Sequence, residues 1–201
     1  MTTLYLNFLL FAVVISITPG PTNLIALTLG HRYGINSAFA FIISAASAAS
    51  LILLFTAQGI ANILITYPLL QQIMAWIGCI WLIWLSWKLY WTPAIATADE
   101  RDAFTRPSWI QGAGLQFINP KTWFMAMTVS SLFNSTDSHS FNHNLTLAII
   151  FFFVACNTLV CWTLLGQLTR KILSSTKQND IINKILAVLL LLSVLSAMFT
   201  L

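Results

Sequence analysis

The sequence predicts an all-α integral membrane protein with six transmembrane helices. Of its 201 residues, 58% are hydrophobic and only 7% are charged, whereas a soluble domain contains about 25% charged residues. A membrane-spanning helix needs about 20 mostly apolar residues, and six windows of the chain meet this requirement. These windows are residues 4–29, 38–64, 69–91, 109–133, 145–168 and 181–201. Lipid must therefore cover a surface that has too few polar groups for water.

The six windows predict a single transmembrane domain, residues 1–201, that is built from two halves. The first half covers about residues 1–91, a cytoplasmic loop follows at about 92–108, and the second half covers about 109–201. Because an odd number of spans precedes the second half, that half enters the membrane from the opposite side. We therefore expect two inverted three-helix repeats.

Lys and Arg residues gather on one side of the predicted membrane. The connections after the first, third and fifth spans, with their flanks, contain eight of them, whereas both termini and the other two connections contain none. The eight are Arg32, Lys88, Arg101, Arg106, Arg170, Lys171, Lys177 and Lys184. An excess of Lys and Arg marks the cytoplasmic side. We therefore expect a multi-pass protein with both termini outside, whose first span is retained because no basic residue precedes it.

Two spans contain proline in the middle of an apolar run. The first span contains ISITPGPTNLIAL, and the fourth contains GLQFINPKTWFMAM. Proline lacks a backbone N–H and clashes with the preceding helical turn, but it suits the first position of a helix. Thr18 precedes Pro19 and Asn119 precedes Pro120, and Thr and Asn are good N-cap residues. We expect a new half-helix to begin at each motif; an ordinary proline kink is the alternative for either break alone.

Both predicted breaks lie near the middle of the bilayer. Pro19 is 11 residues from Phe8, and Pro120 is 11 residues from Trp109. At 1.5 Å per residue, each lies about 16 Å from opposite faces of a core that is about 30 Å thick. The start of a helix leaves backbone N–H groups free, and these favour anions. Interrupted segments at matching places in two halves point to a transporter binding site.

Lys121 follows the second break and is too deep to reach the membrane surface easily. No Asp or Glu lies in the interior of any predicted span, and an unpaired buried ammonium is costly. The carboxylate of an amino acid would pair with Lys121 and the free N–H groups; bonding of Lys121 to protein carbonyls is the structural alternative. The candidate substrate-binding residues are Thr18, Pro19, Gly20, Pro21, Asn23, Asn119, Pro120 and Lys121.

Other functional classes find less support in the sequence. A membrane redox carrier or a metal-ion exporter of related architecture is the alternative. The cysteines, Cys79, Cys156 and Cys161, form no C-x-x-C pair, and all three histidines are predicted in connections. We find no nucleophile–base pair, no paired carboxylates and no phosphate loop, and no basic patch for nucleic acid. We therefore expect no catalytic residues, no metal and no cofactor.

These motifs resemble those of the LysE/RhtB family of amino acid exporters. The matching pieces are TPGPTNL (18–24), HRYG (31–34), IGCIWLIWLSWKL (77–89) and FINPKTW (117–123). The resemblance covers essentially the whole chain. It implies an antiporter of the bacterial inner membrane that exports amino acids or their derivatives and is driven by the proton gradient. Its expected partners are the amino acid and the lipid bilayer, and a homo-oligomer is a further possibility.

The second span departs from the family pattern. Many members have an acidic residue there, whereas this chain has SAASAAS (44–50), with Ala49 near the place of the acid. The small residues allow close helix packing, and three hydroxyls lining a polar path are a second interpretation. The missing acid favours a neutral substrate of the cysteine, O-acetylserine, threonine or homoserine type. In this respect the span is similar to that of the cysteine/O-acetylserine exporters.

Overall fold

The structure is a computed structural model that describes residues 2–60, 66–91, 108–133, 141–172 and 176–198. Within these residues it contains eight α-helices, one short π-helix and no strand, which confirms the all-helical prediction. The elements are α1 (Thr2–Ile17), α2 (Pro21–Tyr33), α3 (Ile35–Phe55), η1 (Thr56–Ile60), α5 (Pro68–Trp91), α6 (Trp109–Ile118), α7 (Pro120–Phe133), α8 (Phe141–Ile172) and α9 (Thr176–Met198). The predicted cytoplasmic loop, with Arg101 and Arg106, lies outside the described residues.

Two stretches of helix in the described residues are long and apolar enough to cross a membrane, Ile35–Ile60 and Phe141–Arg170. A third candidate is the pair Thr3–Ile17 and Pro21–Tyr33, whose helices are apolar enough together and are bent by 61° at the break, as in a broken span or a re-entrant loop. These apolar helices agree with a multi-pass membrane protein. The arrangement of six spans in two inverted repeats stays a prediction.

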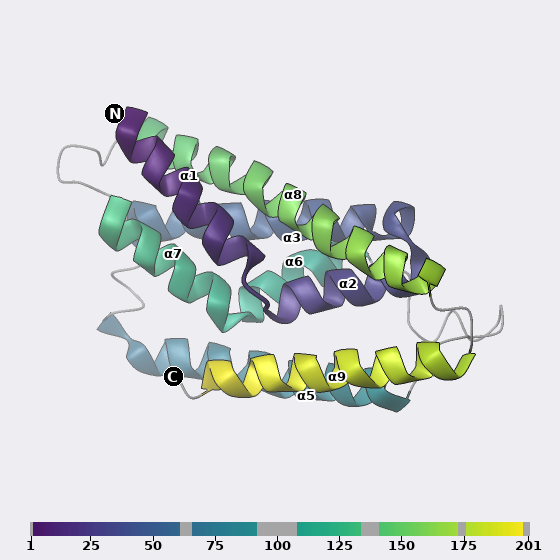
Figure 1. The fold of residues 1–201 in the computed structure, drawn as a ribbon. Helices are drawn as coiled ribbons and strands as arrows, with labels where there is room; N and C mark the ends of the chain where they lie inside the picture. Colours follow the sequence, from purple (N-terminus) through teal and green to yellow (C-terminus); the bar gives the residue numbers. More distant parts are fainter. Residues whose placement is uncertain (1, 61–65, 92–107, 134–140, 173–175, 199–201) are drawn as a thin grey trace.

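The described residues form three apolar clusters, and two of them contain most of the buried apolar side chains. The break between α1 and α2 lies beside the break between α6 and α7 (Figure 1). α1 and α7 contribute to one cluster, which includes Phe8 and Val129. α2 and α6 contribute to the other, which includes Leu29 and Leu115. α3 and α8 run through both clusters, so they hold the two halves of each broken span in place.

α2 and α8 pack so closely that their crossing requires glycine. A Cβ atom on Gly30 would collide with the backbone carbonyl of Thr163, and one on Gly166 would collide with the carbonyl of Leu27. Small residues at a helix crossing in lipid allow this close approach of two backbones. The crossing therefore fixes the position of α8 relative to α2.

The small residues of SAASAAS also serve close packing. Ser44 lies against Gly112 of α6, where a Cβ atom would collide with the Ser44 hydroxyl. The same hydroxyl donates to the carbonyl of Phe41 at 3.2 Å. The packing interpretation of this stretch is therefore confirmed at Ser44, where the hydroxyl is buried in the contact between α3 and α6.

Candidate functional site

The first break differs from the prediction in its N-cap. α2 begins at Pro21, and its N-cap is Gly20 in an extended conformation (φ −160°, ψ 173°). Thr18 belongs to the end of α1, because its hydroxyl donates to the carbonyl of Val14 at 2.7 Å. The prediction that Thr18 caps the new helix is therefore wrong. A threonine can satisfy its hydroxyl within its own helix, and here it does so.

The second break begins where the sequence predicts. α6 ends at Ile118 and α7 begins at Pro120. Asn119 lies between them in an extended conformation, and its side-chain oxygen accepts a hydrogen bond from the backbone N–H of Lys121 at 3.1 Å. The N-cap prediction for Asn119 is therefore confirmed. Gly78 of α5 covers the break, because a Cβ atom there would collide with the carbonyl of Ile118.

The two breaks lie side by side, although they belong to the first and fourth predicted spans. The Asn119 amide donates to the Thr22 hydroxyl at 3.1 Å, and both residues are buried. The Lys121 ammonium donates to the carbonyl of Thr18 at 2.6 Å. The Lys121 side chain also lies over Gly20, where a Cβ atom would be 3.1 Å from its Cδ. Lys121 therefore reaches from the start of α7 across the first break.

Asn23 satisfies carbonyl groups that the first break leaves without partners in a helix. Its amide donates to the carbonyl of Ser16 at 2.8 Å and to that of Thr18 at 3.0 Å. Irregular backbone in a membrane needs such partners. Asn23 and Lys121 thus share the Thr18 carbonyl, and both hold the break in its observed shape.

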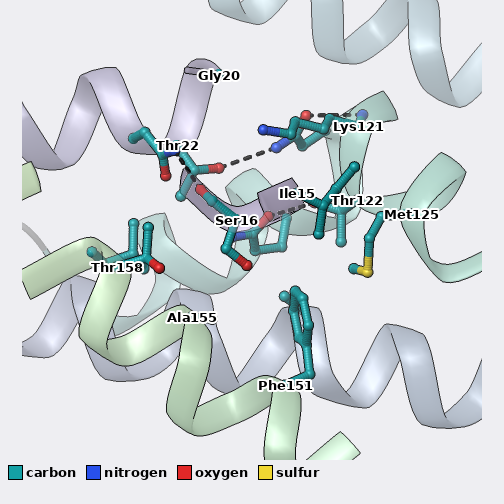
Figure 2. Close-up of a pocket in the computed structure, with 15 residues that line it drawn as sticks. Ile15, Ser16, Gly20, Thr22, Lys121, Thr122, Met125, Phe151, Ala155 and Thr158 are labelled. Carbon is teal, nitrogen blue, oxygen red and sulfur yellow. Dashed lines mark hydrogen bonds between the residues drawn. The ribbon is translucent and has the colours of Figure 1, made fainter. Parts of the chain in front are cut away.

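A pocket of about 60 Å³ lies between the breaks and α8 (Figure 2). This volume can hold several water-sized groups. Four of the predicted site residues line the pocket, namely Gly20, Asn23, Asn119 and Lys121. The opposite wall comes from α8 and contributes Phe151, Ala155 and Thr158 (Figure 2).

A second pocket, of about 470 Å³, lies on the other side of Lys121. The predicted site residues that line it are Thr18, Pro19, Gly20, Pro21 and Lys121. Pro120 lines neither of these two pockets. Gly20 and Lys121 line both, so the lysine side chain borders two cavities.

A match to a known family covers both breaks. The family model described as "LysE type translocator" matches residues 13–198. The chain belongs to this family. The LysE resemblance of the two proline motifs is thereby confirmed, because both motifs lie inside the matched region.

Two relatives of this chain have the same name. A protein of Salmonella typhi named "Cysteine/O-acetylserine efflux protein" is 28% identical over 169 residues, which are 82% of this chain and 83% of the relative. A protein of Escherichia coli O157:H7 with the same name is 25% identical over 191 residues, which are 94% of each chain. No solved structure matches the chain.

The structure places several site residues that the sequence did not single out. Gln116 is 5% exposed, lines the smaller pocket and accepts a hydrogen bond from the Thr122 hydroxyl at 2.6 Å. Ser16, Thr22 and Thr158 line the same pocket. Gln116 carries a signal in the sequence, since it is a polar residue one turn before the break. Thr158 carries none, because its role depends on how α8 packs.

Two histidines lie in helices and not in connections, so that prediction is wrong for both. His31 is buried near the end of α2, where its Nδ1 is 3.0 Å from the Thr169 hydroxyl. His143 is buried near the start of α8, 3.1 Å from both the Tyr5 hydroxyl and the Phe133 carbonyl. Both rings bridge helices that are far apart in the sequence. The third histidine lies outside the described residues.

The described residues also bear on the alternative functions. Among them, no group of three or more His, Cys, Asp and Glu side chains could hold a metal ion. Cys79, Cys156 and Cys161 are unpaired, and they are buried, half-buried and exposed, respectively. Membership of the LysE family does not favour a redox carrier or a metal-ion exporter.

Proposed function

We propose that the protein exports small neutral amino acids or their derivatives across the bacterial inner membrane, as an antiporter driven by the proton gradient. Its substrates would be of the cysteine, O-acetylserine, threonine or homoserine type, in line with the names of its relatives. The observation that carries this proposal is the Lys121 ammonium, which lies at a pocket where two broken spans meet.

The Lys121 charge is the natural partner of a substrate carboxylate. Its ammonium is bonded to the Thr18 carbonyl, which is neutral, so its positive charge has no counter-ion there. A charge-assisted hydrogen bond to a carboxylate is about twice as strong as a neutral one. Binding of the substrate would therefore replace or supplement the bond to Thr18.

The two helix starts contribute unequally to this anion site. At the start of α7, Asn119 already accepts from the backbone N–H groups of Lys121 and Thr122, at 3.1 Å each. At the start of α2, the N-cap is Gly20, which has no side chain to accept from the N–H groups of Thr22 and Asn23. We therefore assign the carboxylate to Lys121 and the start of α2.

The lining of the pocket favours a neutral side chain. All of its lining residues belong to the described part of the chain, and none of them is Asp or Glu. Ala49 lines the pocket, near the place where many family members have an acid. A lysine or arginine substrate would lack a counter-ion here and would be repelled by Lys121.

Export can be tested by metabolite analysis of the medium of cells that overexpress the protein. We expect cysteine and O-acetylserine to accumulate in the medium faster than in cells that carry an empty vector. Cells that express the Lys121→Ala variant at the same membrane level serve as the matched control. An unchanged medium, with protein confirmed in the membrane, would refute amino acid export.

The orientation in the membrane can be tested with reporter fusions. We propose that both termini face outward, so a fusion at Thr97 should report the cytoplasm and one at Ser138 the outside. Both positions lie outside the described residues, and the expectation rests on the distribution of Lys and Arg. Activity of a cytoplasmic reporter at Ser138 would reverse the orientation.

A further inference from the structure

We propose that the hydroxyls of Ser16 and Thr158 recognise the side chain of the transported amino acid. The inference rests on the proposed function and adds the residues that recognise the side chain of the substrate. The preferred substrates are small α-amino acids whose short side chain ends in a hydrogen-bonding group. Lys121 and the start of α2 would hold the carboxylate, and the two hydroxyls would select the side chain.

The Thr158 hydroxyl makes no hydrogen bond within the described residues, unlike two other threonines of α8. Elsewhere on α8, Thr146 donates to Asn142 at 2.8 Å and Thr163 donates to Leu159 at 2.7 Å, each one helical turn back. Thr158 is only 9% exposed and lines the pocket. A hydroxyl in a mostly buried residue gains stability from a hydrogen bond, so Thr158 is available to bond to a group inside the pocket.

Ser16 presents a second hydroxyl without a hydrogen-bond partner. Its Oγ is buried and has no hydrogen-bond partner, and the residue lines the same pocket as Thr158. Its backbone carbonyl is already bonded by Asn23, so the hydroxyl is the part of Ser16 that remains to be paired. The two hydroxyls come from α1 and α8, which pack against each other.

The Thr158 hydroxyl lies where the side chain of a bound amino acid would lie. Figure 2 shows Phe151, Ala155 and Thr158 on α8, on the opposite side of the pocket from Gly20 and Lys121. A carboxylate that binds Lys121 would therefore direct its side chain toward α8.

The rest of the α8 side of the pocket limits the side chain in size and polarity. Phe151, Ala155, Thr158 and Leu159 line it from α8, and Ala49 and Met125 line it from α3 and α7. Apart from Thr158, all of these side chains are apolar, so one or two hydrogen bonds are the polar contacts available there. The small volume, about 60 Å³, favours a short side chain.

The inference can be tested by competition in proteoliposomes that contain the purified protein. The probe is labelled cysteine, and the competitors form pairs that differ in one hydrogen-bonding group: cysteine against 2-aminobutyrate, and homoserine against norvaline. A site that bonds a polar group typically rejects the analogue that lacks it. We expect the wild type to prefer the polar member of each pair.

Thr158→Val keeps the shape of the side chain and removes the hydroxyl. We expect it to reduce the preference for the polar competitor about tenfold, the range for loss of one buried hydrogen bond, and to weaken the apparent affinity for labelled cysteine by a similar factor. Ser16→Ala should reduce the preference in the same direction, and Thr158→Ser should retain it. Thr146→Val is the matched control, because Thr146 is bonded within α8 and does not line the pocket.

The outcomes separate this inference from the proposed function. An unchanged preference in both Thr158→Val and Ser16→Ala, with wild-type transport of cysteine, would overturn the side-chain assignment and leave export standing. Absence of amino acid transport by the wild-type protein would overturn both. If Thr158→Val does not fold, as judged by its elution from a sizing column, the Ser16→Ala result decides the question.

Discussion

Lys121→Ala is expected to weaken amino acid transport strongly while the protein remains folded in the membrane. The substitution removes the ammonium that borders the two pockets and that we assign to the substrate carboxylate. Hydrogen bonds to charged groups contribute about 1.5–3 kcal/mol, so we expect a loss of roughly 10- to 100-fold in apparent affinity. The measurement is uptake of labelled cysteine into proteoliposomes with an imposed pH gradient.

The structural alternative for Lys121 predicts a different result. Its ammonium bonds to the Thr18 carbonyl at 2.6 Å, so a purely structural lysine would stabilise the break. In that case Lys121→Ala would lower the melting temperature, and the remaining folded protein would transport normally. Lys184→Ala is the matched control, since Lys184 lies over the ring of Tyr90 at 5.5 Å and lines neither pocket. Normal transport by well-folded Lys121→Ala protein would refute the binding assignment.

The two breaks show how far local chemistry predicts a helix start. At Asn119 the sequence was sufficient to predict the helix start, because the Asn–Pro pair supplies both the N-cap and the first helical residue. At Thr18 it was not, because Thr18, Gly20 and the two prolines permit a start at either proline. The hydrogen bond from Thr18 back to Val14 decides the matter, and a sequence pattern does not show which of two local bonds will form.

The walls of the pocket could be predicted less well than the breaks. Lys121 stood out because a charge in an apolar span is rare, whereas Thr158 looks like any threonine in a helix. Its place in the pocket follows from the packing of α8 on α1, α2 and α3. The histidines were misplaced for a related reason. A hydropathy window ends where polar residues begin, but His31 and His143 extend their helices and bond to other helices.

Substitution of Gly30 by alanine is expected to destabilise the protein strongly, because α2 and α8 cannot move apart locally. The added Cβ atom would collide with backbone atoms of Thr163, not with the end of a flexible side chain. Overpacking of this kind costs about 3 kcal/mol, which for a protein of this size corresponds to a fall of about 10 °C in melting temperature. The measurement is thermal unfolding of the detergent-purified protein.

Gly114→Ala provides the matched control for this prediction, since a Cβ atom on Gly114 has nothing within 4 Å. It should melt at or slightly above the wild-type temperature, because alanine is the better helix former. The comparison also bears on the binding site. Gly30 and Gly166 hold α8 against α2, and Thr158 reaches the pocket from α8. If Gly30→Ala melted like the wild type, the crossing would not be tight, and the position of Thr158 would require another cause.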